Sequence, residues 1–200
     1  MARPKKFDPQ AALVNSMQVF WRKGYTATSV KDLENATGLV PSSLYNAFGN
    51  KEALFLQILE HYAEKVVGKR IERYLNQKDP IKSIVDFFTS CFTDLADGNE
   101  GLACLLVNST AEVASHHKGV HELINNYDLL LQENFLRCVE QAKREQRISD
   151  RFDSVLVAEQ LSLSLNGLLL KSRVIRDNDK MLKACHQSLT FILGSTAFSM

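Results

Sequence analysis

The stretch that decides the fold runs from Thr28 to Lys51 and reads TSVKDLENATGLVPSSLYNAFGNK. It begins with the signals of a helix start. Thr28 and Ser29 carry hydroxyls that can cap a helix, and Asp32 follows Ser29 by three residues, as in a capping box. Apolar side chains then recur at helical spacing, at Val30, Leu33 and Ala36. The beginning of the stretch therefore predicts a short helix with one apolar face.

Gly38 and Pro41 divide the stretch into two parts. Glycine readily adopts the left-handed backbone that ends a helix, and proline is well suited to the first position of the next one. Leu44 and Phe48 lie four residues apart and predict the buried side of this second helix. A short helix, a glycine turn and a second helix with a polar face predict a helix-turn-helix, whose second helix enters the DNA major groove.

The flanking residues extend this pattern. FWRKGYTATSV occupies residues 20–30 and LYNAFGNKEAL occupies residues 44–54. With these elements, residues from about 11 to 59 resemble the N-terminal domain of the TetR family of transcriptional repressors. The sequence departs from the family pattern at Val40, where relatives often have a polar residue that caps the second helix. We expect a weaker cap at this position.

The helix geometry and the resemblance together predict the DNA contacts. Ser42, Ser43 and Asn46 lie away from the apolar side of the second helix, so they are expected at base edges, where asparagine can bond adenine. Free N–H groups and the helix dipole favour a phosphate at the start of the first motif helix. The resemblance implies backbone contacts for Tyr45 and Lys51. The complete set of candidates is Thr28, Ser29, Lys31, Pro41, Ser42, Ser43, Tyr45, Asn46 and Lys51.

Proline and glycine punctuation predicts helices along the rest of the chain, and no alternating strand pattern is present. The predicted fold is all-α. An N-terminal three-helix helix-turn-helix DNA-binding domain occupies residues 1–52 and runs into a connecting helix over residues 51–74. A larger helical domain for ligand binding and dimerisation follows over residues 53–200.

The resemblance also implies a homodimer in which the last two helices pair with their copies. A dimer is needed if two recognition helices are to read a palindrome about 34 Å apart. The candidate interface residues are Leu161, Leu165, Leu168, Leu189 and Ile192. The same apolar stripes could equally form the core of a single chain.

Composition and charge agree with this interpretation. The net charge is only +1, but residues 1–52 hold seven Lys and Arg against four Asp and Glu, so positive charge gathers in the expected DNA-binding domain. No apolar run is long enough for a membrane span, and the N-terminus lacks the apolar core of a secretory signal. We therefore expect a cytoplasmic protein without a membrane partner.

Cysteine and histidine give no metal signal. The four cysteines are scattered without CxxC spacing, which argues against a zinc site or a disulfide framework. His117 and His121 have a spacing that can hold a metal from one helix, but Gly119 makes a continuous helix there unlikely. We expect a solvated loop at these histidines, and neither a metal nor a cofactor.

The effector site is the least defined part of the prediction. The segment GLACLLVNSTAEVA, residues 101–114, resembles the GCLLVN segment of one TetR subgroup, which implies part of a ligand-pocket wall. Cys104 and Asn108 are four residues apart and are the pocket candidates. Cys104 could also be a thiol sensor for electrophiles or oxidants, although no basic residue lies within one turn of it.

These features predict a transcriptional regulator, most simply a repressor that binds a palindromic operator as a homodimer and is released by a small-molecule effector of unknown identity. One alternative is a thiol-sensing repressor that uses Cys104. Another is a helical protein-interaction module that does not bind DNA. An enzyme is not expected, because the sequence has no GxGxxG, GxxxxGK[ST], GxSxG or HExxH motif.

Overall fold

The computed structural model describes residues 8–93, 101–113 and 117–194. These residues form helices and connecting turns, and no strand occurs among them. The helices are α1 (Pro9–Lys23), α2 (Val30–Thr37), α3 (Pro41–Phe48), α4 (Lys51–Tyr62), the π-helix η1 (Ala63–Gly68), α5 (Lys69–Tyr74), α6 (Pro80–Thr93), α7 (Leu105–Glu112), α8 (Lys118–Arg144), α9 (Ser154–Ile175) and α10 (Asn178–Leu193). The all-α prediction is confirmed.

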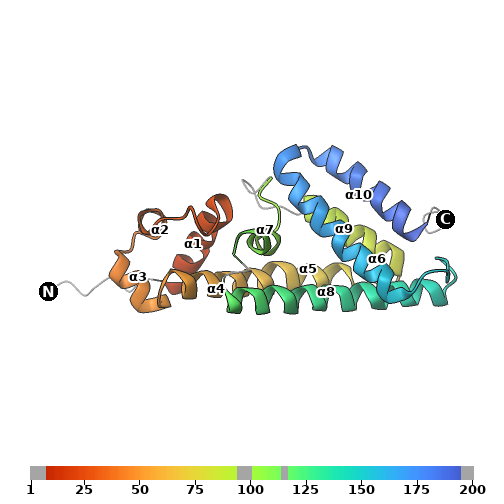
Figure 1. Ribbon diagram of the computed structural model, residues 1–200, viewed down its shortest axis with the longest axis horizontal. Coiled ribbons are helices and arrows are strands. Elements are labelled where there is room, and N and C mark those ends of the chain that lie inside the picture. Colours follow the sequence, from red (N-terminus) through yellow and green to blue (C-terminus); the bar gives the residue numbers. More distant parts are fainter. Residues whose placement is uncertain (1–7, 94–100, 114–116, 195–200) are drawn as a thin grey trace.

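The helices α1, α2 and α3 form a small head at one end of the molecule (Figure 1). A head and a longer helical body share α4, which packs against α1 and α3 at one end and against α7 and α8 further along. The apolar core of the head includes Phe20, Leu33, Leu44 and Phe55, each almost completely buried. The periodicity of the motif therefore identifies Leu33, Leu44 and Phe48 correctly as buried, whereas Val30, predicted on the same face as Leu33, is 39% exposed.

A continuous helical rod connects head and body. Its backbone is helical from Lys51 to Tyr74, with α4, η1 and α5 following one another without a break. The π-helical segment in the middle was not predicted from the sequence. Figure 1 shows that the rod and the long helix α8 lie along the same side of the molecule, below the other helices.

The body is built around α6, α8, α9 and α10. Helix α9 packs on both α8 and α10, and α6 packs on α8 and α10. Phe87, Phe88 and Phe135 are fully buried at the centre. The ring centroid of Phe135 lies 5.6 Å from that of Phe87 and 5.8 Å from that of Phe88. Burial of large aromatic side chains supplies much of the hydrophobic stabilisation of such a core.

The predicted dimer leucines lie inside this core. Leu161, Leu165, Leu168 and Leu189 are all buried within the single chain, and Ile192 is half-buried against them. The structure thus favours the alternative in which these stripes are the core of one chain. Apolar side chains on the opposite face of α9 remain exposed instead: Leu156, Leu163, Leu170 and Val174. Because α9 is apolar on two faces, periodicity alone could not distinguish the inner face from the outer one.

Among the described residues, no helix combines the length and the hydropathy that crossing a bilayer would require.

Candidate functional site

The helix-turn-helix is formed by α2 and α3. Ser29 is the N-cap of α2, and its hydroxyl accepts the N–H of Asp32 while the Asp32 carboxylate accepts the N–H of Ser29. Gly38 ends α2 in the left-handed conformation, with φ +69°. The capping box and the glycine turn predicted from the sequence are both confirmed.

The recognition helix α3 buries one side and leaves the other accessible. Leu44 and Phe48 are buried, whereas Ser42 and Asn46 are exposed one turn apart. Pro41, Ser43 and Tyr45 are half-buried at the margins of the exposed side. The accessible surface therefore combines a hydroxyl and an amide at i, i+4 spacing, groups that can bond base edges in a groove.

Val40 is the N-cap of α3 and makes no side-chain hydrogen bond there, as its chemistry requires. Its carbonyl oxygen accepts the N–H groups of Ser43 and Leu44, and Pro41 has no N–H. Of the backbone N–H groups in the first turn of α3, that of Ser42 has no acceptor among the described residues. This donor lies on the exposed side, next to the surface expected to meet DNA.

Thr28 is wrong as a DNA contact. It is only 2% exposed, and its hydroxyl donates to the carbonyl of Gly24 at 2.6 Å. Its N–H also has an acceptor, the carbonyl of Tyr25. Two adjacent hydroxyl residues offered alternative caps in the sequence. Ser29 takes the capping role, and Thr28 turns inward to hold the α1–α2 turn.

The two candidate lysines differ in their surroundings. Lys31 is highly exposed and pairs with Glu34 at 3.0 Å on the surface of α2. Lys51, the first residue of α4, is half-buried, and its Nζ lies 4.6 Å from the centroid of the Tyr25 ring. Burial lowers the pKa of Lys51, whereas the charge of Glu112 acts in the opposite direction. Lys51 is thus positioned by the head itself.

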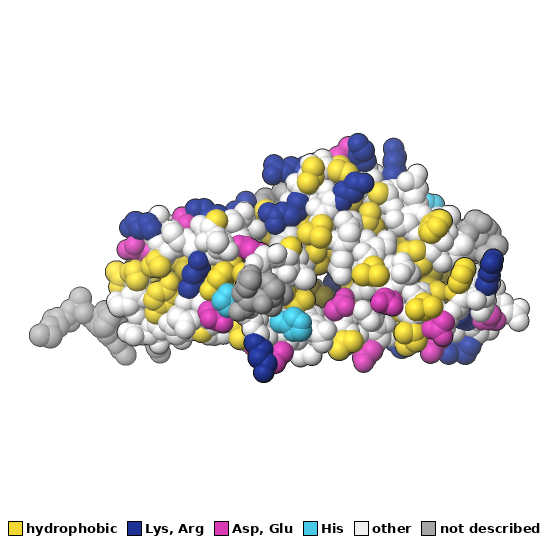
Figure 2. Space-filling model, viewed as in Figure 1, with side chains coloured by type: hydrophobic (Ala, Val, Ile, Leu, Met, Phe, Trp, Pro, Cys, Tyr) yellow, Lys and Arg dark blue, Asp and Glu magenta, His cyan; other side chains and the backbone are white. Residues whose placement is uncertain are grey.

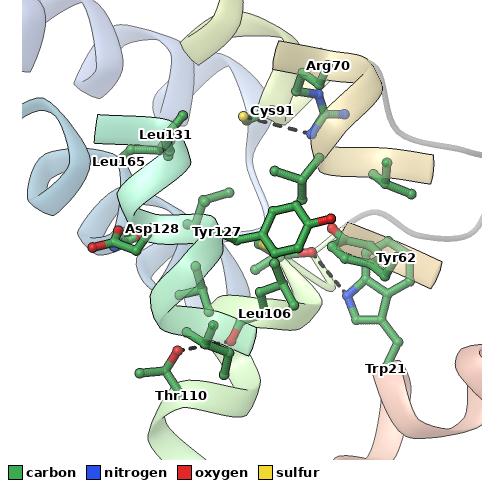
Figure 3. Close-up of a pocket in the computed structure, with 18 of the residues that line it drawn as sticks. Trp21, Tyr62, Arg70, Cys91, Leu106, Thr110, Tyr127, Asp128, Leu131 and Leu165 are labelled. Atoms are coloured by element: carbon green, nitrogen blue, oxygen red, sulfur yellow. Dashed lines mark hydrogen bonds between the residues drawn. The ribbon is translucent and has the colours of Figure 1, made fainter. Parts of the chain in front are cut away.

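A cavity of about 550 Å³ lies between the head and the body. Its wall includes side chains of α1, of the connecting rod, and of α6, α7, α8 and α9. Figure 3 shows Trp21, Tyr62 and Tyr127 grouped on one side, with Leu106 and Thr110 below and Arg70 above. The volume and the mainly apolar wall are typical of a site for a small organic ligand.

Only one of the two predicted pocket residues lines this cavity. Cys104 is the N-cap of α7 and is part of the wall. Asn108 is not a wall residue, because its amide donates to the carbonyl of Leu102 at 2.8 Å and so closes the turn before α7. The guanidinium of Arg70 lies near a different thiol, with 3.8 Å between Arg70 Nη1 and Cys91 Sγ.

The expected histidine loop is wrong. Gly119 lies inside the first turn of α8, and the N–H of His121 donates to the carbonyl of His117 as in a regular helix. His121 lines the cavity, and His117 Nδ1 lies 2.9 Å from Glu52 Oε1. No cluster of three potential metal ligands occurs among the described residues.

Helix α7 connects the cavity to the head. The carboxylate of Glu112, at its C-terminal end, accepts the N–H of Tyr25 at 3.0 Å and the N–H of Thr26 at 2.7 Å. These amides belong to the turn between α1 and α2. Gly24 in this turn has φ +84°, a conformation that favours glycine, and a Cβ there would lie 2.6 Å from Glu112 Oε2. The sequence carried no local signal for this contact, because its partners are 86 and 87 residues apart.

Trp21 provides a second connection between α1 and the cavity. Its indole Nε1 donates to the carbonyl of Ala103 at 3.1 Å, and its ring packs edge-to-face on Tyr62 at 5.1 Å. Both aromatic residues line the cavity. The sequence did not predict that either ring faces a cavity, because helical periodicity cannot show that one side of a buried ring meets an open space.

An exposed recognition helix on a small head, and a ligand-sized cavity behind it, define a helix-turn-helix transcriptional regulator. Comparison with protein families agrees: "Bacterial regulatory proteins, tetR family" matches residues 12–58, and "Tetracyclin repressor-like, C-terminal domain" matches residues 80–188. The chain belongs to the TetR family of bacterial transcriptional regulators.

Similar proteins span almost the whole chain. The HTH-type transcriptional repressor ComR of Escherichia coli (strain K12) is 28% identical over 191 residues, covering 94% of this chain and 90% of ComR. The uncharacterized HTH-type transcriptional regulator YezE of Bacillus subtilis (strain 168) is also 28% identical, and the match covers 90% of this chain and 94% of YezE. A CifR cysteine mutant solved with 26-bp double-strand operator DNA has a TM-score of 0.81 at 22% identity. The match covers 94% of this chain and 98% of the CifR chain.

Proposed function

We propose that this protein is a cytoplasmic, homodimeric repressor that binds a palindromic operator and is released when a small molecule enters the cavity. Residues 1–52 would contact DNA, and residues 53–200 would bind the effector and the second subunit. The observation that carries this proposal is the exposed polar side of α3. Leu44 and Phe48 are buried on the opposite side of the helix and hold it against the head. Repressor names among the relatives and the operator complex of CifR support it.

The predicted DNA contacts that remain are Ser29, Lys31, Pro41, Ser42, Ser43, Tyr45, Asn46 and Lys51. Asn46 is the best candidate for base recognition, because its amide is exposed in the middle of the accessible side of α3. Lys31 and the Ser42 N–H are suited to phosphates, which would position the head without reading sequence. These contacts support a role in regulating transcription.

The DNA-binding proposal is tested with an operator selected from a random DNA pool. Asn46→Ala should reduce discrimination between this operator and random DNA by roughly fivefold to a hundredfold, since one bidentate base contact contributes about 1–3 kcal/mol. Asn126→Ala, at an exposed position of α8, is the matched control. Fluorescence anisotropy with both DNAs over a range of salt concentrations gives the result. Unchanged discrimination in Asn46→Ala would contradict this assignment, and binding insensitive to salt would favour a protein-interaction module instead.

Helix α7 would couple ligand binding in the cavity to release of the operator DNA. The first turns of α7 supply Leu106, Val107 and Thr110 to the cavity wall, and its last residue, Glu112, holds the turn that begins the helix-turn-helix. A ligand that displaces α7 would therefore also displace the α1–α2 turn. Such coupling requires a ligand that interacts differently with the two positions of the helix.

A further inference from the structure

The aromatic side chains of the cavity wall come from three different elements. Trp21 belongs to α1, Tyr62 is the last residue of α4, and Tyr127 belongs to α8. Trp21 and Tyr62 pack edge-to-face at 5.1 Å with an interplanar angle of 76°, and Tyr127 points toward them (Figure 3). Leu106 and Leu131 add aliphatic surface to the wall. Such a wall favours a flat aromatic ligand, because offset and edge-to-face ring contacts add to simple burial.

The charged side chains of the wall already have partners within the protein. Two of the described residues that line the cavity carry a full charge, Arg70 and Asp128. Asp128 accepts the hydroxyl of Ser162 on one oxygen and the amide of Gln132 on the other, at 2.9 Å and 2.8 Å. Arg70 Nη1 lies 3.8 Å from the Cys91 thiol, and Arg70 takes part in a further interaction of the protein. An ionic ligand would therefore have to compete with these partners for either charge.

The other polar groups of the wall suit an uncharged ligand. The Trp21 indole already donates to the carbonyl of Ala103 at 3.1 Å. Gln18, Asn125 and Asn166 also line the cavity and carry neutral amides, which can bond a neutral polar group of a ligand. An ion that enters such a cavity loses its hydration and gains no partner of opposite charge in return. The wall thus disfavours charged ligands of either sign.

We propose that the cavity binds an uncharged aromatic molecule, with its ring against Trp21, Tyr62 and Tyr127. This inference rests on the proposed function, because it gives the chemical class of the effector. The three rings belong to the head, to the connecting rod and to the long helix α8. One bound ring therefore contacts the DNA-binding head and the body at the same time.

The single tryptophan of the chain provides the readout. Trp21 gives one indole N–H signal in proton–nitrogen correlation spectra, and an aromatic ring against it shifts this signal. The probes share one ring system: neutral 2-naphthalenemethanol, the anion 2-naphthoate and the cation 2-naphthylmethylammonium, each titrated into the full-length protein without DNA. We expect the alcohol to bind roughly tenfold tighter or more than either ion, because neither ion finds an unengaged charge in the wall.

A cavity-filling variant tests where the probe binds. Val107 of α7 lines the cavity, so Val107→Phe should occupy part of the space and weaken binding of 2-naphthalenemethanol roughly tenfold or more. Val155→Phe is the matched control, because Val155 is 58% exposed on α9 and lies outside the wall. Thermal unfolding shows whether each variant is folded. Equal binding by folded Val107→Phe and by the wild type would place the probe elsewhere.

A second variant tests why ions are disfavoured. Ser162→Ala leaves one oxygen of Asp128 without its donor, so the preference for the alcohol over the cation should fall roughly threefold or more. Ser164→Ala, on the same helix but outside the wall, is the control and should leave the preference unchanged. An unchanged preference in folded Ser162→Ala would show that the pairing of Asp128 does not exclude cations.

The wild-type comparison is decisive even if a variant does not fold. Equal affinity for the three probes, tighter binding of either ion, or no binding of the alcohol by spectroscopy and by equilibrium dialysis would overturn the proposal. Competition by decahydro-2-naphthalenemethanol as strong as that of the aromatic alcohol would overturn its aromatic part. Operator release is measured separately: release by an ionic compound alone would refute the uncharged class while leaving the repressor function intact.

Discussion

At the scale of single residues, Asp32 has two structural roles. Its carboxylate closes the capping box of α2 with Ser29, and it also accepts a hydrogen bond from Lys23 of α1 at 2.5 Å. The Lys23 hydrogen bond is the largest cause of the lowered pKa of Asp32, about 2, followed by the bonds from Ser29. One half-buried carboxylate therefore fixes both the start of α2 and its position relative to α1.

This lowered pKa predicts a pH-dependent stability. The folded pKa of about 2 is below the usual value of 3.8, so the contribution of Asp32 is present above pH 4 and is lost as the pH falls toward 2. Chemical denaturation should show Asp32→Asn less stable than the wild type near pH 6, with the difference shrinking steadily between pH 4 and pH 2. Asp150→Asn, at an exposed turn position, serves as the control. A difference independent of pH would show that the charge of Asp32 is irrelevant.

At this scale the local chemistry was predictable from the sequence, whereas the direction of a side chain was not. Ser29, Gly38 and Val40 have the capping properties that their side chains predict. Thr28 and Asn108 were assigned to surfaces that they do not reach, since both turn toward backbone carbonyls of their own segments. A hydroxyl or an amide carries no signal in the sequence that separates these outcomes, because the choice depends on the neighbouring chain.

At the scale of elements, α7 is the short helix that contacts both the cavity and the head. Its Glu112 holds two consecutive amides of the α1–α2 turn with a charged acceptor. Nearby, Glu52 of α4 contacts His117 at the start of α8, and the rings of His117 and Tyr25 lie 5.2 Å apart. The turn that precedes the helix-turn-helix is thus held in place by contacts with Glu112 and His117 of the body.

We expect Glu112→Gln to loosen this turn without unfolding the head. A neutral amide accepts hydrogen bonds more weakly than a carboxylate and presents an N–H₂ group to one of the two donors, a loss of about 1–2 kcal/mol. Hydrogen exchange of the Tyr25 and Thr26 amides should accelerate roughly tenfold. The Gly38 amide at the end of α2 should be unaffected, and Glu122→Gln on the surface of α8 should change neither. Unchanged exchange at Tyr25 would show that Glu112 does not hold the turn.

At the scale of the whole molecule, the exposed apolar surface indicates how two subunits would meet. Figure 2 shows hydrophobic side chains spread over the outer surface of the body. Leu163 is 56% exposed and Val174 84% exposed on the outer stripe of α9, and Phe191 of α10 is 92% exposed. A Cβ added at Gly167, on the same side, would meet no atom within 4 Å. Large apolar side chains exposed along one stripe of a helix, as on α9, are typical of interaction surfaces.

The proposed homodimer should therefore depend on the outer residues and not on the buried leucines. Leu163→Asp should convert the dimer into folded monomers and abolish cooperative binding to a palindromic operator, because a buried interface does not tolerate an unpaired carboxylate. Leu129→Asp, at a similarly exposed position of α8, should leave the dimer intact. Sedimentation with circular dichroism distinguishes these states. A dimer that persists in folded Leu163→Asp would place the interface elsewhere.

The sequence predicted the whole-molecule plan, all-α with a DNA-binding head, since helix periodicity and turn residues are local properties. It predicted a ligand pocket with Cys104 in its wall, but it did not predict the other parts of that wall, the Glu112 contact or the inner face of α9. Each of these depends on residues far apart in the chain, such as Trp21 with Ala103 and Glu112 with Tyr25.

Because of the π-helical segment η1, the orientation of the head depends on the number of residues in the connecting rod. Successive residues of an α-helix are rotated by about 100° and advance by about 1.5 Å, so a π-turn inserts an offset between the helical turns of α4 and those of α5. Within η1, the neighbours Val66 and Val67 both face the cavity, while Glu64 and Lys65 are exposed. Substitutions at the exposed positions leave this offset unchanged. Deletion of one residue would turn α3 around the rod axis, so that two heads in a dimer would no longer face the same side of a DNA duplex.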